Sequence, residues 1–436
     1  MHNDHADPRS IIEHSPMGWG QWVAVIVMVG LNALDGFDVL SISFASPGIA
    51  RDWQLESSIL GWVLSMELFG MAVGSFALGP AADRLGRRYT ILICLVAMTI
   101  GMFGASVSTS MTELLVWRLL TGLGIGGMLA SINAATAEYS NARWRGFAMS
   151  IMVIGYPLGG VFGGLIVQDM LVDGTWHDVF TFGAWLTAAF IPITLLLVPE
   201  TPAFLDRRRG PDALERINRI LKRFGQRAAE TLSPLEEDHD DASIFDILKP
   251  GLLAITILVT LAYFAHITSF YYLIKWVPKI VVDLGFEASS AAGFLTWLNV
   301  GGATGGAIFG LVATRVGLRK LTIVTLLLAF VTIVAFGGGA TERTVLTATI
   351  VAAGFFTNAG IAGLYALFAR VFPTHVRATG TGFAIGVGRG GAVIAPIIAG
   401  YLFQADLGLQ TVSIVMASGA LLGAILLFVL GRYATD

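Results

Sequence analysis

Twelve stretches of mostly apolar residues recur along this 436-residue chain, each long enough to cross a bilayer as a helix. A spanning α-helix needs about 20 apolar residues, because its backbone polar groups must be satisfied within the helix. Only 13% of the residues are charged and 55% are hydrophobic, which argues against a soluble protein. The expected fold is an all-α integral membrane protein with spans at roughly 19–45, 57–80, 90–109, 112–138, 145–170, 179–198, 251–280, 288–313, 321–338, 344–370, 378–402 and 410–431.

Lys and Arg concentrate in alternate loops of this topology, which predicts its orientation. The side with fewer basic residues holds only Arg51, Lys279 and Arg343. By the positive-inside rule the richer side is cytoplasmic, so we expect a multi-pass protein of the bacterial inner membrane with both termini in the cytoplasm. The first ten residues show no signal-peptide pattern. The richer side holds Arg9, Arg84, Arg87, Arg88, Arg143, Arg145, every Lys and Arg from Arg207 to Lys249, Arg315, Arg319, Lys320, Arg370, Arg377 and Arg432.

The sequence lacks the motifs that mark several other classes of function. The chain has one cysteine, Cys94, no Cys/His cluster with metal-ligand spacing, and no Walker-type loop. We therefore expect no metal, no cofactor and no nucleotide-driven transport. No nucleophile–base arrangement suggests a membrane enzyme, and the short hydrophilic segments argue against a nutrient sensor with a soluble output domain. The expected partners are the lipid bilayer, a small solute and protons, with no nucleic acid, and the chain is expected to act as a monomer.

The longest hydrophilic segment, about residues 199–250, separates six spans from six. We expect an N-terminal six-helix bundle at 1–198, a cytoplasmic connector at 199–250 and a C-terminal six-helix bundle at 251–436. Within the connector, residues 211–227 have the pattern of an amphipathic surface helix, followed by an acidic run at 236–241. The connector itself is interpreted as a solvated link.

A repeat relates the two halves. A shift of 231 residues aligns Gly79–Arg88 with Gly310–Arg319 and also carries Pro47 onto Pro278. Several matches at one shift predict two pseudo-symmetric bundles. Parallel repeats of this kind place a substrate site near the midplane between the halves, with access alternating as the halves rock.

Two acids lie in the middle of the first span. A carboxylate at mid-bilayer costs about 2.5–3.5 kcal/mol on insertion scales. The three-residue spacing of Asp35 and Asp38 puts both on one face of a helix, where they can share a proton. We therefore predict that both couple transport to protons. Glu67, in the second span, is a further candidate relay without an identifiable partner.

The segment Gly79-P-A-A-D-R-L-G-R-R88 resembles the cytoplasmic signature of the major facilitator superfamily. The resemblance implies a gate, in which Asp83 bonds backbone donors across the interface and Arg87 and Arg88 pair with acids such as Glu138. The alternative is a simple positive-inside anchor. The second copy has Thr314 where the repeat predicts an acid, which weakens the case for a second latch. The expected gating residues are Gly79, Asp83, Arg84, Gly86, Arg87, Arg88, Glu138 and Arg377.

Two further segments resemble the same superfamily. Arg118-L-L-T-G-L-G-I-G-G127 is similar to its fourth-span pattern, and an intramembrane Arg must face a partner or water. Proton coupling and structural pairing both remain open for Arg118. Pro199-E-T-P-A-F-L205 resembles the segment after the sixth span in the sugar, organic-ion and organic-acid branches.

The Asp-Gly-Phe-Asp motif at 35–38, together with Arg389 in Gly386–Gly391, resembles the aromatic acid:proton symporter family over the whole chain. That resemblance implies proton-coupled uptake of an aromatic carboxylate, such as a benzoate or phenylpropanoid. The residues support an anion site independently, because a guanidinium binds both oxygens of a carboxylate. Arg389 is therefore the predicted anion clamp.

The seventh span adds aromatic candidates. The repeat shift places His266 opposite Asp35, and Tyr271 and Tyr272 would stack on an aromatic substrate. For each, packing is the alternative: a histidine bonded to a backbone carbonyl, and an aromatic stripe buried between helices. Lys275 is expected at the periplasmic end, where its long side chain would reach water.

Two rival transport functions remain. One is proton symport of a non-aromatic organic acid or a sugar by the same machinery. The other is proton-driven efflux, because drug antiporters of this superfamily carry Gly-Pro-x-x-Gly-Gly in the fifth span. The element here, Gly155-Y-P-L-G-G160, has one residue fewer between the proline and the glycine pair.

Overall fold

The computed structural model describes residues 7–234, 244–373 and 376–433, and helices are the only regular secondary structure in this part of the chain. The predicted all-α membrane fold is confirmed, with twelve helices long and apolar enough to span a bilayer. They are Trp19–Asp52 (α2), Ser57–Leu85 (α3), Arg87–Ser106 (α4), Met111–Tyr139 (α5), Arg145–Asp173 (α6), Trp176–Leu197 (α7), Pro250–Asp283 (α10), Ala288–Ala313 (α11), Leu318–Gly337 (α12), Arg343–Val371 (α13), Arg377–Gln404 (α14) and Leu409–Leu430 (α15).

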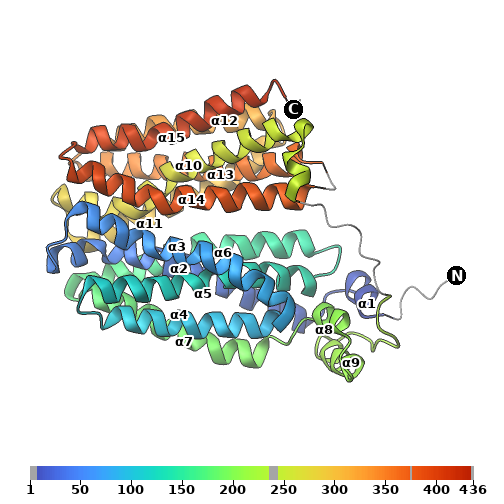
Figure 1. Ribbon diagram of the computed structural model, residues 1–436. Helices are drawn as coiled ribbons and strands as arrows, with labels where there is room; N and C mark the ends of the chain where they lie inside the picture. Colours follow the sequence, from blue (N-terminus) through green and yellow to red (C-terminus); the bar gives the residue numbers. More distant parts are fainter. Residues whose placement is uncertain (1–6, 235–243, 374–375, 434–436) are drawn as a thin grey trace.

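The spanning helices form two bundles, α2–α7 and α10–α15, which lie one above the other in Figure 1. The 231-residue repeat reappears in the helix boundaries. It carries Trp19–Asp52 onto Pro250–Asp283 and Arg87–Ser106 onto Leu318–Gly337. The pseudo-symmetry inferred from the sequence is therefore a property of the backbone.

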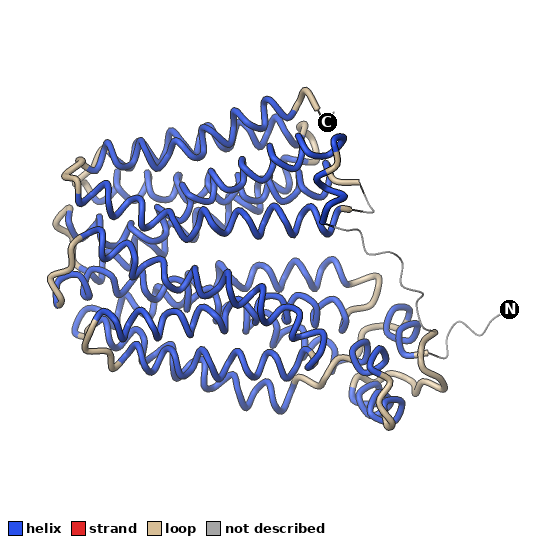
Figure 2. The backbone as a smooth tube through the Cα atoms, viewed as in Figure 1, coloured by secondary structure: helices blue, strands red, loops and turns tan. Residues whose placement is uncertain are grey.

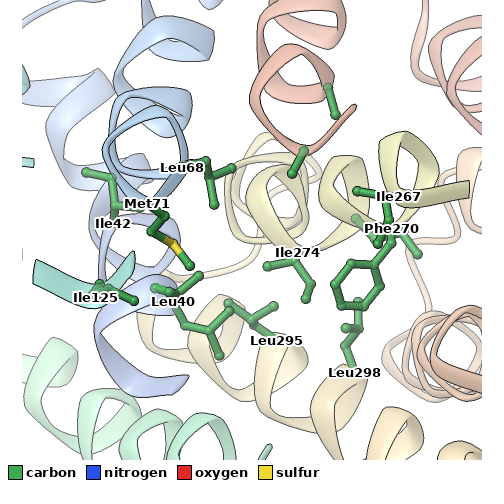
Figure 3. Packing of buried hydrophobic residues seen from close by; sticks show 14 of the residues in the cluster. Leu40, Ile42, Leu68, Met71, Ile125, Ile267, Phe270, Ile274, Leu295 and Leu298 are labelled. Atoms are coloured by element: carbon green, nitrogen blue, oxygen red, sulfur yellow. The ribbon is translucent and has the colours of Figure 1, made fainter. Parts of the chain in front are cut away.

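Large apolar side chains cover the outside of both bundles. Phe162, Trp185, Leu311 and Phe428 are each more than half exposed. Apolar surface on this scale is unsuited to water and fits a lipid environment. Inside, apolar residues from both bundles form one continuous cluster, in which Leu40 of α2 lies near Leu295 of α11 (Figure 3).

Glycines let α2 and α6 approach at backbone distance. A Cβ atom at Gly36 would collide with the carbonyl of Tyr156, and one at Gly159 would collide with the carbonyl of Ala33. Small residues at helix crossings are the usual means of tight packing in membranes. This contact brings Tyr156 close to the acidic part of α2.

The bundles meet most closely at the end away from α1, α8 and α9. There Gly61 of α3 faces the carbonyl of Pro396 in α14, and Gly164 of α6 faces Thr296 of α11. The backbones diverge toward the opposite end, which we call the terminal face (Figure 2). The two bundles are therefore closed against each other on the face far from α1, α8 and α9.

Short helices gather at the terminal face against the first bundle: Pro8–His14 (α1), Pro202–Arg208 (α8) and Ala213–Arg223 (α9). Ile11, Phe204 and Ile217 belong to their shared small apolar core. The amphipathic helix expected at 211–227 is present as α9. A short 3-10 helix at Ile244–Leu248 (η1) precedes α10, and the acidic run at 236–241 lies outside the described residues.

Candidate functional site

Asp35 and Asp38 lie on one face of α2, as their spacing predicts. Both side chains are buried; among the described residues neither carboxylate accepts a well-formed hydrogen bond, and the Thr187 hydroxyl near Asp38 donates to the carbonyl of Gly183. A buried carboxylate without donors is costly when ionised. Chemically, this pair is suited to taking up a proton.

Glu67 of α3 is the centre of the charged cluster. One of its oxygens forms an ion pair with the Arg118 guanidinium of α5, and the other lies 3.6 Å from the ammonium of Lys275 in α10. All three side chains are fully buried. Arg118 also donates to the carbonyl of Asp38 at 3.0 Å, which ties the cluster to the helix that carries the acids. Sequence reasoning found Glu67 and Arg118 but did not pair them.

The expectation for Lys275 is wrong. Its side chain does not reach water at a helix end; it is completely buried, with Nζ donating to the carbonyl of Val39 at 2.5 Å. The physical reason is that Lys275 faces the first bundle, where Glu67 provides an opposite charge. Buried ammonium groups persist only with such partners.

Arg389 of α14 crosses to the first bundle. Its Nη1 donates to the hydroxyl of Ser75 in α3 at 2.7 Å. Ser75 in turn donates to the carbonyl of Met71 at 2.9 Å. Within the described part of the chain Arg389 forms no ion pair, so its charge is available to an anion. Gly388 leaves the space that the ring of Tyr263 occupies beside it.

Tyrosines from α6, α10 and α13 form a group on the same side of the site as this cation. Tyr156 of α6 and Tyr271 of α10 lie within electrostatic reach of Arg389 and of each other. The hydroxyls of Tyr263 and Tyr365 (α13) are 3.0 Å apart, with ring centroids separated by 5.6 Å. Sequence reasoning named Tyr271 but not Tyr156 or Tyr365. Tyr156 sits in the Gly155-Y-P element of α6, which was a usable signal, whereas nothing in the sequence marked Tyr365.

His266 and Tyr272 point into the second bundle. The Nε2 atom of His266 lies 2.8 Å from the carbonyl of Thr357 in α13, and the Tyr272 hydroxyl lies 2.8 Å from Ser413 of α15. Both side chains are buried. Both residues thus make the packing contacts that were the alternative to substrate binding. A direct role of either residue in substrate binding stays a prediction, which this geometry does not favour.

The signature segment ends in an ion-pair network. Arg87 bridges Asp83 at 2.7 Å and Glu138 at 3.0 Å, and Glu138 also pairs with Arg207 of α8 at 3.1 Å. The expected pairing of Arg87 with Glu138 is therefore present. The partner of Asp83 is Arg87 of the same bundle, rather than a backbone donor across the interface.

The remaining gating candidates make fewer contacts. Arg88 donates to the carbonyl of Leu195 at 2.6 Å instead of pairing with an acid. Arg377 donates to the carbonyl of Phe372 at 3.4 Å, within the second bundle. A Cβ at Gly79 would meet nothing within 4 Å, and Arg84 is exposed. In this conformation the described ion pairs join α3, α4 and α5 of the first bundle to α8, and they include no residue of the second bundle.

Glu200 holds the turn that starts α4. Its carboxylate accepts from the backbone nitrogens of Arg87 at 2.9 Å, Arg88 at 3.3 Å and Thr201 at 2.9 Å. Gly86, with φ of 103°, makes the turn in a backbone region that favours glycine. Burial raises the pKa of Glu200, and these backbone donors oppose the rise. The sequence noted Glu200 only as part of the Pro199–Leu205 motif.

The described residues include no group of three or more His, Cys, Asp or Glu side chains able to hold a metal ion. The chemistry available at the site is therefore that of carboxylates, guanidinium and ammonium groups, and phenols. Such an arrangement can exchange protons and bind an anion with an aromatic body.

Comparison with known proteins agrees with this architecture. A sequence profile of the Major Facilitator Superfamily matches residues 28–336 and 259–435. A gallate transporter of Pseudomonas putida is 29% identical, covering 92% of this chain and 90% of that protein. A 3-(3-hydroxy-phenyl)propionate transporter of Escherichia coli is 29% identical over 91% of both chains. The 4-hydroxybenzoate transporter PcaK of Acinetobacter baylyi is 27% identical, covering 97% and 94%.

Solved structures share the fold. The inward-open xylose transporter XylE of E. coli superposes with a TM-score of 0.74 at 17% identity, covering 94% of this chain and 95% of that one. A D-xylose–proton symporter gives 0.72 at the same identity, with coverages of 95% and 98%.

Proposed function

This protein belongs to the Major Facilitator Superfamily, and from that membership we propose that it takes up an aromatic carboxylate together with protons by alternating access. It is a transporter and not an enzyme. The resemblance stated from the sequence motifs is confirmed, since its relatives include transporters of gallate and 4-hydroxybenzoate. Related transporters of four different aromatic acids support an aromatic substrate here.

The observation that carries the proposal is the position of Arg389. Its guanidinium bonds Ser75 of the other bundle, has no acid partner in the part of the chain that the structure describes, and lies within electrostatic reach of Tyr156 and Tyr271. A planar guanidinium binds a carboxylate through two parallel hydrogen bonds, and phenol rings offer faces for a second aromatic ring. An aromatic acid matches both features, whereas a sugar has no charge for Arg389 to bind.

Charge balance supports proton coupling. The ionisable groups at mid-helix are three buried acids, Asp35, Asp38 and Glu67, two buried cations, Arg118 and Lys275, and the half-buried cation Arg389. When all are ionised they sum to zero. A bound carboxylate adds one negative charge, and a single proton on Asp35 or Asp38 restores neutrality. Because uncompensated charge is costly in the membrane interior, substrate and proton enter together.

The terminal face is assigned to the cytoplasm. The basic residues of α8 and α9 lie there, as do Arg84 at the end of α3 and Arg87 and Arg88 at the start of α4, and Lys and Arg favour the cytoplasmic side. We infer a multi-pass protein of the bacterial inner membrane, acting as a monomer, with bundles at 1–198 and 251–436 joined by residues 199–250. The ion pairs of Arg87 then lie at the cytoplasmic gate.

Uptake by purified protein in liposomes tests this function. We expect an imposed outside-acid gradient to drive accumulation of benzoates or phenylpropionates, with xylose and dicarboxylates as matched non-aromatic solutes. Accumulation of xylose in place of the aromatic acids would contradict the proposal. If the outside-acid gradient instead drives preloaded aromatic acid out of the liposomes, the protein is an antiporter.

A further inference from the structure

Lys275 is a cation of the second bundle whose polar partners lie in the first. Its ammonium donates to the Val39 carbonyl of α2 at 2.5 Å and lies 3.6 Å from the Glu67 carboxylate of α3. Both Lys275 and Glu67 have no exposed surface. This ion pair therefore joins the two halves of the molecule inside the membrane-spanning region.

The pair is not part of the repeated scaffold. The 231-residue shift that relates the bundles places Phe44 opposite Lys275 and Leu298 opposite Glu67. Neither residue thus has an ionisable counterpart in the other half. A charged contact present once, between bundles that are otherwise related by symmetry, points to a task that the symmetric packing does not perform.

Glu67 divides its two oxygens between the bundles. One is paired with Arg118 of its own half and the other faces Lys275 of the opposite half. The charged and titratable groups around it are Asp35 and Asp38 of α2, Arg118 of α5, Tyr156 of α6, and Tyr271 and Lys275 of α10; Arg389 of α14 is a neighbour of the two tyrosines. If the bundles separated here, Glu67 would keep Arg118, whereas Lys275 would lose both of its partners.

We propose that Lys275 and Glu67 form a latch between the bundles, which holds the conformation closed on the far face and releases when a proton neutralises the acid cluster. This inference rests on the proposed proton-coupled transport. Protonation of Glu67, or of an adjacent aspartate that passes its proton to it, removes the charge that holds Lys275. A buried ion pair that loses one charge is strongly destabilised, so the halves are freed to part. Lys275 is thereby a positioning residue that transmits the proton state to the second bundle.

The test follows the opening of the far face without any substrate. Thr296 of α11 is buried against Gly164 of α6, on the closed side of the interface. In a Cys94→Ala background, a Thr296→Cys reporter is exposed to a membrane-impermeant maleimide only when the bundles separate there. We expect Lys275→Met to raise the labelling rate roughly tenfold or more, the population change produced by loss of one charged hydrogen bond.

Lys279 provides the matched control. It lies one turn further along α10 and pairs with Asp283 of the same helix. Lys279→Met should leave labelling at the wild-type rate, and Lys275→Arg should restore it toward that rate. Equal labelling of the Lys275→Met, Lys279→Met and unmodified reporters would overturn the latch. If Lys275→Met yields no folded protein, Glu67→Gln removes the charge from the other side and is expected to accelerate labelling in the same way, with an unchanged rate again counting against the latch.

A transport readout separates this inference from the proposed function. In liposomes, Lys275→Met should reduce proton-driven accumulation of an aromatic carboxylate far more than its exchange, whereas a purely structural role would reduce both by the same factor. If the unmodified protein transports no aromatic acid, the proposed function fails, and the labelling experiment still decides the latch.

Discussion

The guanidinium of Arg389 in one bundle donates to the hydroxyl of Ser75 in the other at 2.7 Å. A cation that bridges two moving bodies through a neutral hydroxyl, and not through an acid, keeps its charge uncompensated. An entering carboxylate can replace the hydroxyl with a stronger, charge-assisted pair of hydrogen bonds. Substrate binding and the relation between the bundles are thereby linked at one side chain.

Arg389→Ala should weaken substrate binding by about 10- to 100-fold, the change that corresponds to loss of a charged hydrogen bond worth roughly 1.5–3 kcal/mol. Arg389→Lys should weaken it less, because an ammonium keeps the charge without the planar fork. Binding of the acid is to be compared with binding of its uncharged amide. A mutation that penalises acid and amide equally would show that Arg389 does not read the carboxylate.

Asp35→Asn and Asp38→Asn should each abolish accumulation driven by a pH gradient while leaving the protein in the membrane. Both carboxylates are buried and accept no well-formed hydrogen bond among the described residues, so each is suited to taking up a proton. Uptake under an imposed gradient, with membrane abundance as control, checks this. A variant that still concentrates substrate excludes that residue as an obligatory coupling site.

Transport of a monoanionic acid should be electroneutral, with one proton per substrate. The three acids and three cations of the site sum to zero when all are ionised, so one bound anion then requires one proton. A potassium diffusion potential imposed with valinomycin at constant pH should leave the initial rate unchanged. A rate that rises steeply with potential would indicate more than one proton per cycle.

Asp83→Ala should slow transport and exchange in both directions while leaving substrate affinity within a few-fold of wild type. Asp83 contacts Arg87 at the terminal face and lies in the signature segment, away from the Arg389 cation. Exchange kinetics and equilibrium binding on the same preparation separate the two effects. A large loss of affinity with normal exchange would contradict a gating role.

Glu200→Ala should lower stability by about 1–2 kcal/mol, because it removes the acceptor for the first backbone donors of α4. Glu200→Gln keeps an acceptor and removes the charge.

Burial raises the pKa of Glu200 in the folded protein. Its contribution to stability is thus present below the pKa of the unfolded carboxyl and is lost as pH rises through the higher folded value. As the pH is raised from acidic to neutral, the thermal midpoint of the wild type should therefore fall more than that of Glu200→Gln. Midpoints that change by the same amount in both proteins would contradict this.

Much of the architecture follows from the sequence alone. The twelve spans come from apolar length, because a bilayer has a definite thickness and leaves no backbone group unsatisfied. The repeat of 231 residues predicted the paired bundles, and it recurs in the bounds of α2 and α10. Helical periodicity placed Asp35 and Asp38 on one face, since that relation is local to a single helix.

Contacts between helices required the tertiary structure. Glu67, Arg118 and Lys275 come from three helices, and their pairing depends on how α3, α5 and α10 rotate about their axes, which spacing along the chain does not encode. For the same reason Lys275 was misplaced, Tyr365 went unnoticed, and His266 and Tyr272 could not be assigned to the packed side before the fold was known. The sequence shows that a charged residue lies within an apolar span and is therefore costly to bury. Which residue pairs with it depends on how the helices of the two bundles pack.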